Sequence, residues 1–233
     1  MPKPLIFCAI DTDDIEDAVK LAASIGPVTG GIKLGLEFFN ANGPQGVARV
    51  MAAAGGAQLF LDLKYHDIPN TVAGAVRAAC AATNPAFLNV HAAGGLEMMR
   101  TAKAACAPGT KLLAVTILTS LSTVELGDVG FEGPADTCVA RLAKLAKQAG
   151  LDGVVCSALE IAALRKALGP DFILMVPGIR PKGADAGDQK RIMDPQAAIA
   201  AGASHLVIGR PITQARDPAA AAQEILVTIN DVR

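Results

Sequence analysis

The chain has 233 residues, which suits one large domain, and 52% of them are apolar, which is enough for a buried core. The formal net charge is −1, and Lys and Arg form no runs. A nucleic-acid partner is therefore not expected.

Short apolar runs alternate with helical patterns along the chain. Continuous apolar runs such as LLAVTIL and DGVVCS are typical of strands that are buried on both faces. The predicted strands are Leu5–Asp11, Gly31–Gly35, Leu59–Lys64, Phe87–His91, Lys111–Leu118, Gly153–Ser157, Phe172–Gly178 and His205–Gly209. The predicted helices are Asp13–Ser24, Gln45–Ala54, Val72–Ala82, Leu96–Ala105, Asp136–Gln148, Leu159–Leu168, Pro195–Ala201 and Pro218–Asn230. We expect N-caps at Asp13 and Asp194, and helix ends at Gly26, Gly150 and Gly202.

Eightfold β–α alternation favours an α/β fold, a single-domain (β/α)8 TIM barrel over residues 1–233. A doubly wound open sheet is the alternative. It is weakened because the first strand is followed by DTDD and not by a G-x-G-x-x-G turn. Two connections, Thr119–Gly133 and Arg180–Met193, are long enough to be lids or binding loops.

The cysteines and the N-terminus indicate the compartment. The five cysteines are odd in number, show no C-x-x-C spacing and fall largely in apolar runs, as buried thiols do. The apolar stretch in MPKPLIFCAID is too short for a signal peptide, and no window has the length of a membrane span. We expect a cytoplasmic protein with no membrane partner.

Chemically active side chains follow the predicted strands at their carboxyl ends, where a barrel builds its active site. Asp62 and Lys64 are two residues apart on one strand and therefore share a face, and Lys33 on the neighbouring strand can reach it. Such a Lys–Asp–Lys cluster favours a charged ammonium at Lys64, which suits an acid or a charge stabiliser and not a Schiff base. A purely structural ion-pair network is the alternative.

The last two strands indicate an anion site. VIGRP supplies Gly209 for close backbone approach and Arg210 for a bidentate contact, and VPGIRP with Gln189 adds donors from the preceding loop. The alternative is a tight turn followed by a solvated arginine. His91, at a strand end, is expected to be structural, His66 to face outward and His205 to lie at the opposite barrel end. No His, Cys and Glu spacing resembles a transition-metal site, so no metal is expected.

The segment DLKYHDIPNT, from Asp62 to Thr71, carries the pattern D-x-K-x-x-D-I-P-x-T. With AIDTDD, GGIKLGLEFF, NVHAAGG, LTSL, VPGIRP and VIGRPIT in this order, the sequence resembles the bacterial orotidine 5′-monophosphate decarboxylase family over essentially its whole length. The resemblance implies decarboxylation of orotidine 5′-monophosphate to UMP in pyrimidine biosynthesis, without a cofactor.

The resemblance also implies a role for each matching residue. Lys64 donates a proton to the product carbon, within a charged network that includes Asp62, Lys33 and Asp67. Asp67, Ile68 and Thr71 come from the other subunit of a homodimer with shared active sites. The ribose is held by Asp11 and Lys33, the pyrimidine by Thr119 and Ser120, and the phosphate by Arg180, Gln189, Gly209 and Arg210.

Two other functions share parts of this pattern. Mg²⁺-dependent enzymes such as 3-keto-L-gulonate 6-phosphate decarboxylase and hexulose 6-phosphate synthase have the same D-x-K-x-x-D. They place an acidic ligand on the second strand, where this chain has Lys33, which would repel the metal. A non-catalytic nucleotide-binding barrel is the second alternative.

Overall fold

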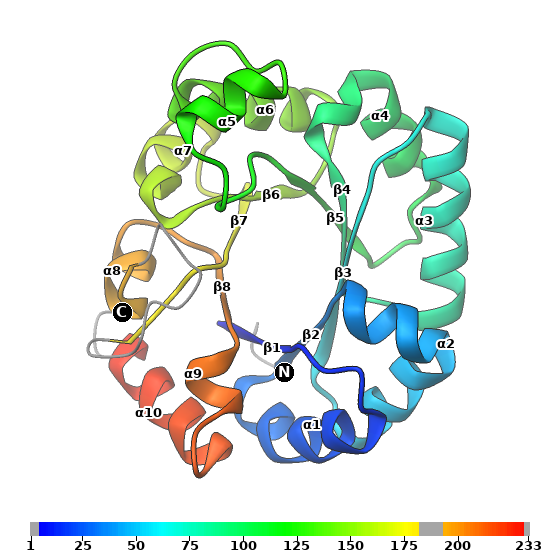
Figure 1. Cartoon of the computed structure of the whole chain (residues 1–233), viewed down its shortest axis with the longest axis vertical. Coiled ribbons are helices and arrows are strands. Elements are labelled where there is room, and N and C mark those ends of the chain that lie inside the picture. Colours follow the sequence, from blue (N-terminus) through cyan, green and yellow to red (C-terminus); the bar gives the residue numbers. More distant parts are fainter. Residues whose placement is uncertain (1–4, 182–192, 231–233) are drawn as a thin grey trace.

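The computed structural model describes residues 5–181 and 193–230, and within them eight parallel strands close into a barrel (Figure 1). The strands are β1 Ile6–Ile10, β2 Gly31–Leu34, β3 Gln58–Tyr65, β4 Phe87–His91, β5 Lys111–Val115, β6 Gly153–Val155, β7 Ile173–Val176 and β8 His205–Ile208. Each pairs with the next in the sequence, and β8 pairs with β1. This closure confirms the predicted barrel and excludes the open sheet.

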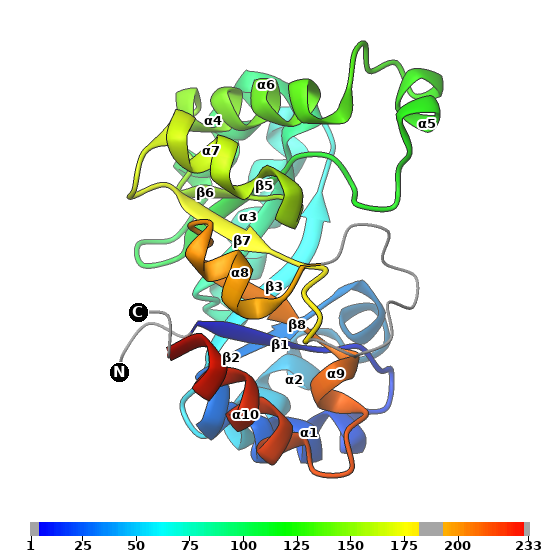
Figure 2. The ribbon, with the colours of Figure 1, turned by 90° about the vertical axis from the view of Figure 1, so that its left-hand side faces the viewer.

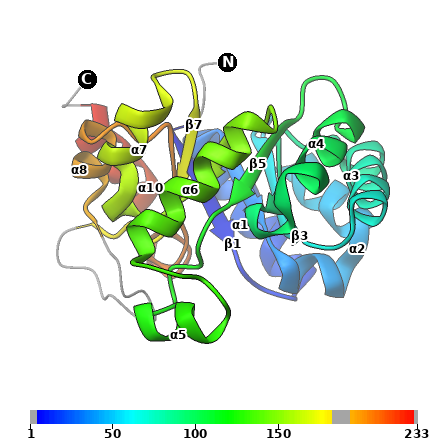
Figure 3. The ribbon, with the colours of Figure 1, turned by 90° about the horizontal axis from the view of Figure 1, so that it is seen from above.

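Helices surround the barrel and bury it on its outer side (Figure 1). They are α1 Ile15–Thr29, α2 Leu36–Ala53, α3 Pro69–Thr83, α4 Gly95–Ala105, α5 Thr123–Asp128, α6 Ala135–Gln148, α7 Ile161–Leu168, α8 Pro195–Ala200, α9 Arg210–Thr213 and α10 Pro218–Asn230. Single 3-10 turns are formed by Ala92–Gly94 and Ala158–Glu160. The helix α5, within the predicted long connection, projects away from the body of the barrel (Figures 2 and 3). No helix in the described ranges is long and apolar enough to cross a membrane.

The ends of α1 differ from the prediction. The cap is Asp14 and not Asp13, because the Asp14 carboxylate accepts from the N–H groups of Glu16 and Asp17. Gly26 does not end the helix, which continues to Thr29. A Cβ at Gly26 would lie 2.3 Å from the carbonyl oxygen of Ala54, so this glycine permits close contact with the end of α2.

The other predicted helix ends are confirmed. Gly150 and Gly202 follow α6 and α8 with φ values of +81° and +106°, a region that favours glycine. Asp194 caps α8 by accepting from two backbone N–H groups. α2 begins at Leu36, well before the predicted start, and is kinked at Gly43, where φ is +61°.

The amino ends of the strands are closed by an aromatic plug. Phe7, Phe60 and Phe87 pack edge to face, with ring centroids 5.2–6.3 Å apart. His205 is buried against this cluster, 5.1 Å from the ring of Phe87, at the barrel end that the sequence predicts. These side chains therefore fill the barrel interior at the amino ends of the strands. The barrel is open at the carboxyl ends.

Candidate active site

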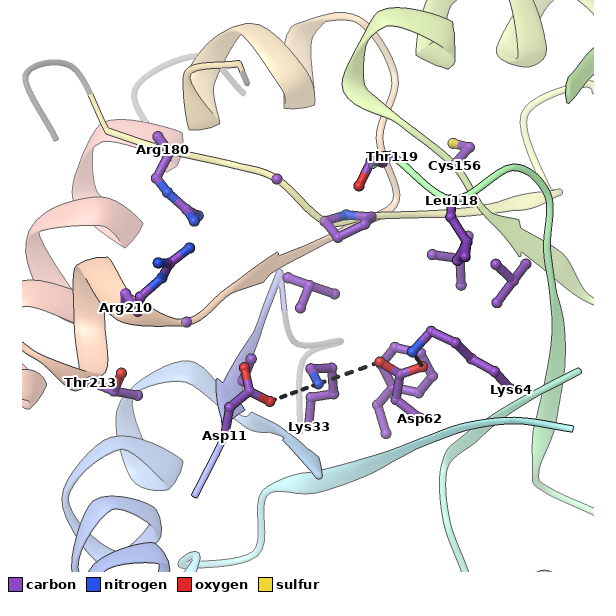
Figure 4. A pocket seen from close by; sticks show the side chains of 18 of the residues that line it. Asp11, Lys33, Asp62, Lys64, Leu118, Thr119, Cys156, Arg180, Arg210 and Thr213 are labelled. Atoms are coloured by element: carbon purple, nitrogen blue, oxygen red, sulfur yellow. Dashed lines mark hydrogen bonds and ion pairs between the residues drawn. The ribbon is translucent and has the colours of Figure 1, made fainter. Parts of the chain in front are cut away.

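A cavity of about 460 Å³ opens at the carboxyl ends of the strands (Figure 4). Most of the predicted site residues line it: Asp11, Lys33, Asp62, Lys64, Thr119, Arg180, Gly209 and Arg210. They come from six different strands or the loops that follow them. Ser120 is exposed and is not part of the described lining, and Gln189 lies outside the described residues.

The predicted Lys–Asp–Lys cluster forms one wall of the cavity. The Lys64 Nζ lies 2.7 Å from Asp62 Oδ1, and the Lys33 Nζ lies 3.4 Å from Asp62 Oδ2. Lys33 also contacts Asp11 Oδ1 at 3.2 Å, so its ammonium stands between two carboxylates. The side chains of Lys33 and Asp62 are only 10% and 13% exposed, whereas that of Asp11 is 62% exposed.

Pairing keeps this buried cluster ionised. Burial alone would lower the pKa of Lys33, but Asp62 and Asp11 outweigh it and raise the pKa above its ordinary value. Burial alone would raise the pKa of Asp62, but Lys33 and Lys64 outweigh it and hold the pKa below its ordinary value. Fixed charges of both signs therefore face the cavity at neutral pH.

The backbone of Lys64 is left-handed, with φ of +51°, which is unusual for a residue other than glycine. Such a conformation costs about 1–3 kcal/mol and persists only where its surroundings enforce it. It coincides with an irregular register between β3 and β4, between Leu61 and Tyr65. Nothing in the residue pattern of DLKYHD predicts this strain.

Sequence reasoning also missed Asn89, a fully buried residue of β4. Its Nδ2 donates to Asp62 Oδ1 at 2.7 Å, and its Oδ1 accepts from the backbone N–H of Lys64 at 2.8 Å. A signal was present, because Asn89 is two residues before His91 on one strand and so shares its face.

Arg180 and Arg210 lie across the cavity from Lys64 and Asp62 (Figure 4). Arg180 follows β7 and is buried, whereas Arg210 is the first residue of α9. Gly209 lies against β1, where an added Cβ would be 3.3 Å from that of Ala9. Two guanidinium groups therefore line this end of the cavity.

Part of the cavity lining is apolar. It includes Ile117, Leu118 and Val155, together with Cys156. Burial raises the pKa of the Cys156 thiol, so it stays protonated.

Asp67, Ile68 and Thr71 do not reach the cavity of their own chain. All three are exposed on the surface, and Ile68 is 68% exposed. Asp67 and Ile68 border a separate shallow depression with His66 and Gly94. Ile68 follows Asp67 and precedes Pro69, in the segment that leads from β3 into α3.

The rings of His66, just after β3, and His91, the last residue of β4, lie with centroids 5.4 Å apart and planes tilted by 30°. His66 is exposed, as predicted, while His91 is half-buried. Burial, together with electrostatic interactions with His66 and Lys64, lowers the pKa of His91.

Comparison with known proteins indicates one family. Residues 4–225 match the family described as "Orotidine 5'-phosphate decarboxylase / HUMPS family". Orotidine 5'-phosphate decarboxylase of Rhodospirillum rubrum is 54% identical over 229 residues, which cover 94% of this chain and 92% of that protein. The enzyme of the same name from Idiomarina loihiensis is 48% identical over 234 residues, which cover 99% of this chain and 100% of that protein.

A solved structure agrees with this. The crystal structure of orotidine 5'-phosphate decarboxylase from Lactobacillus acidophilus is similar with a TM-score of 0.85 and 37% identity, and the match covers 98% of this chain and 100% of that one. Because the family match spans nearly the whole sequence and relatives are about half identical to it, the chain belongs to the orotidine 5'-phosphate decarboxylase / HUMPS family.

Proposed function

We propose that this protein decarboxylates orotidine 5′-monophosphate to UMP, a step of pyrimidine biosynthesis, with the barrel over residues 1–233 as its single catalytic domain. The observation that carries the proposal is the pairing of Lys64 with Asp62 at one end of a cavity whose other end holds Arg180 and Arg210. A nucleotide substrate needs both ends of the cavity, one for the reacting ring and the other for the distant phosphate.

Loss of CO₂ from C6 of the pyrimidine leaves a carbanion in the ring plane, which the ring π system delocalises poorly. Electrostatic stabilisation must therefore come from fixed groups of the protein. The positive charge of the Lys64 ammonium stabilises the negative charge that develops at C6. The ammonium then donates a proton to C6. Asp62, held by Lys33 and Lys64, lies where the substrate carboxylate departs. We assign no cofactor to this chemistry.

The remaining contacts follow from the two ends of the cavity. We propose that Asp11 and Lys33 bind the ribose, and that Thr119 and Ser120 approach the pyrimidine. Arg180, Gly209 and Arg210 hold the phosphate, with Gln189 as a further donor. Because the phosphate is remote from C6, its binding energy can order the site around the reacting ring.

We further propose a cytoplasmic homodimer whose subunits share their active sites. The exposed group of Asp67, Ile68 and Thr71 supports this, because it follows β3, the strand of Asp62 and Lys64, and yet lines no part of its own chain's cavity. A partner related by a twofold axis would present the same surface in return. The five cysteines are all free, which fits a reducing compartment.

The Mg²⁺-dependent alternative is disfavoured by Lys33. Its ammonium stands between the carboxylates of Asp11 and Asp62, at 3.2 and 3.4 Å, where a divalent cation would otherwise be held. A cation there would have to displace a buried, paired lysine.

The deciding experiment is an assay of orotidine 5′-monophosphate turnover by loss of orotate absorbance, after extensive treatment with EDTA. We expect full activity without metal. Activity that EDTA abolishes and Mg²⁺ restores would support the metal-dependent function instead. Tight binding of UMP or 6-azaUMP without turnover would identify a non-catalytic barrel.

A further inference from the structure

We propose that Asn89 is a positioning residue for the reaction, which sets the placement of both Lys64 and Asp62. The inference rests on the proposed function and deepens it. It is based on a stretch of β3 that does not pair regularly with β4. There a buried side chain, and not the β4 backbone, accepts a hydrogen bond from the β3 backbone.

The departure lies opposite Asn89. Leu61 pairs with Leu88, but the next pair is Tyr65 with Val90, so β3 carries more residues than β4 over this stretch. Lys64 lies in the excess segment and has φ of +51°. The backbone of β4 therefore does not supply the regular partner for the Lys64 N–H, and the side chain of Asn89 accepts it instead, at 2.8 Å.

Both ends of the Asn89 amide are engaged, and only one orientation permits this. A backbone N–H can only donate, so it must meet Oδ1, and the ionised Asp62 carboxylate can only accept, so it must meet Nδ2. Asn89 is fully buried, which removes water as a substitute partner. An aspartate would lose the donor, and an alanine would lose both contacts.

These contacts connect Asn89 to the reacting groups without placing it against the substrate. Asp62 Oδ1 accepts hydrogen bonds from both Asn89 Nδ2 and Lys64 Nζ, each at 2.7 Å. Without Asn89 the Lys64 backbone would lose the partner that holds it in a disfavoured conformation, and Asp62 would lose one of its donors. The Lys64 ammonium would then occupy a range of positions relative to C6.

The test is Asn89→Ala, with Asn89→Asp as the nearly isosteric variant. We expect kcat for orotidine 5′-monophosphate to fall by about 100-fold or more, the effect of an ångström-scale misplacement. Affinity for UMP should change by less than about threefold, because UMP lacks the reacting carboxylate. Affinity for the ionised 6-hydroxy analogue of UMP, which carries its charge beside Lys64, should fall with kcat.

Asn84→Ala is the matched control. Asn84 also has a positive φ, +43°, and it precedes the same strand, but it is exposed and caps α3. It should keep wild-type kcat whatever it loses in thermal stability.

The outcomes separate the two proposals. A wild-type chain that does not turn over the substrate would refute the proposed function. An active wild type with near-normal kcat in both folded Asn89 variants would refute only the role of Asn89. Parallel loss of kcat and of UMP affinity would make Asn89 a structural residue and overturn the inference.

If neither variant folds, the hydrogen bond between Asn89 and the Lys64 N–H can be tested in the wild-type protein. In protein labelled with ¹⁵N-lysine, the Lys64 amide should be protected from hydrogen exchange, although its residue lies at the cavity. Exchange at the rate of a free amide would show that Asn89 does not hold it.

Discussion

The Lys64 ammonium is the group on which the proposed chemistry depends most directly. Its side chain is 30% exposed and pairs with Asp62, so truncation leaves Asp62 with Lys33 and Asn89 as partners. We expect Lys64→Ala to remain folded by circular dichroism while kcat falls by roughly 10²–10⁴-fold or more, the contribution of a positioned acid. Near-wild-type turnover in this variant would remove Lys64 from the mechanism.

Arg210 is expected to act on the phosphate alone. Loss of a hydrogen bond to a charged group costs about 1.5–3 kcal/mol, so Arg210→Ala should lower kcat/KM for orotidine 5′-monophosphate by about 10- to 150-fold. Reaction of orotidine, which lacks the phosphate, should be unchanged. Arg216→Ala, on the exposed surface after α9, is the control and should affect neither substrate. Equal losses on both substrates would contradict a phosphate contact.

His91 should make the fold sensitive to acid. Its pKa in the folded chain lies below the ordinary value of 6.5, so the unfolded chain binds a proton more readily. The stability from this difference is present above pH 6.5 and is lost as the pH falls through the folded pKa. Denaturant titrations should show that His91→Gln loses less stability between about pH 7.5 and pH 5 than the wild type does. Equal losses would exclude His91 as the titrating group.

Among the elements, α1 and α2 meet where Gly26 faces Ala54. A Cβ at Gly26 would lie 2.3 Å from a backbone oxygen, which cannot move without shifting the helix. We therefore expect Gly26→Ala to lower the free energy of unfolding by about 1–3 kcal/mol. Gly127→Ala in α5 is the comparison, because an added Cβ there meets nothing within 4 Å. It should leave stability unchanged or slightly raised, and equal effects at both positions would contradict the steric explanation.

The elements also show how far the sequence alone leads. Eight strands were predictable because each is a short apolar run between helical patterns. Asp62 and Lys33 were placed at the site because they lie in the carboxyl halves of their strands. The predicted start at Gln45 agrees with the helical segment that follows the non-helical Gly43, and the segment of α2 before Gly43 was missed. The spacing to His91 already put Asn89 on the face of the strand that His91 shares, but its contact with Lys64 was not predictable, because that contact depends on the β3–β4 register, a non-local property. The left-handed backbone of Lys64 was missed for the same reason.

For the whole molecule, the shared-site dimer makes a quantitative prediction. Lys64→Ala and Asp67→Ala chains should each be inactive alone. After mixing and random exchange, half of the dimers are mixed, and one of their two sites has an intact Lys64 and an intact Asp67. Activity should therefore return to roughly one quarter of the wild-type value. No recovery after verified exchange would mean that each site is built within one chain.

At position 64, stability and chemistry favour different residues. The left-handed backbone favours glycine, whereas the proposed reaction requires the lysine ammonium. Glycine would adopt this conformation without the cost that lysine incurs, about 1–3 kcal/mol. Selection for thermal resistance alone would therefore favour loss of the lysine and yield robust, inactive barrels. Engineering of this protein should hold position 64 fixed and seek its gains at the aromatic plug and the helix ends, away from the cavity.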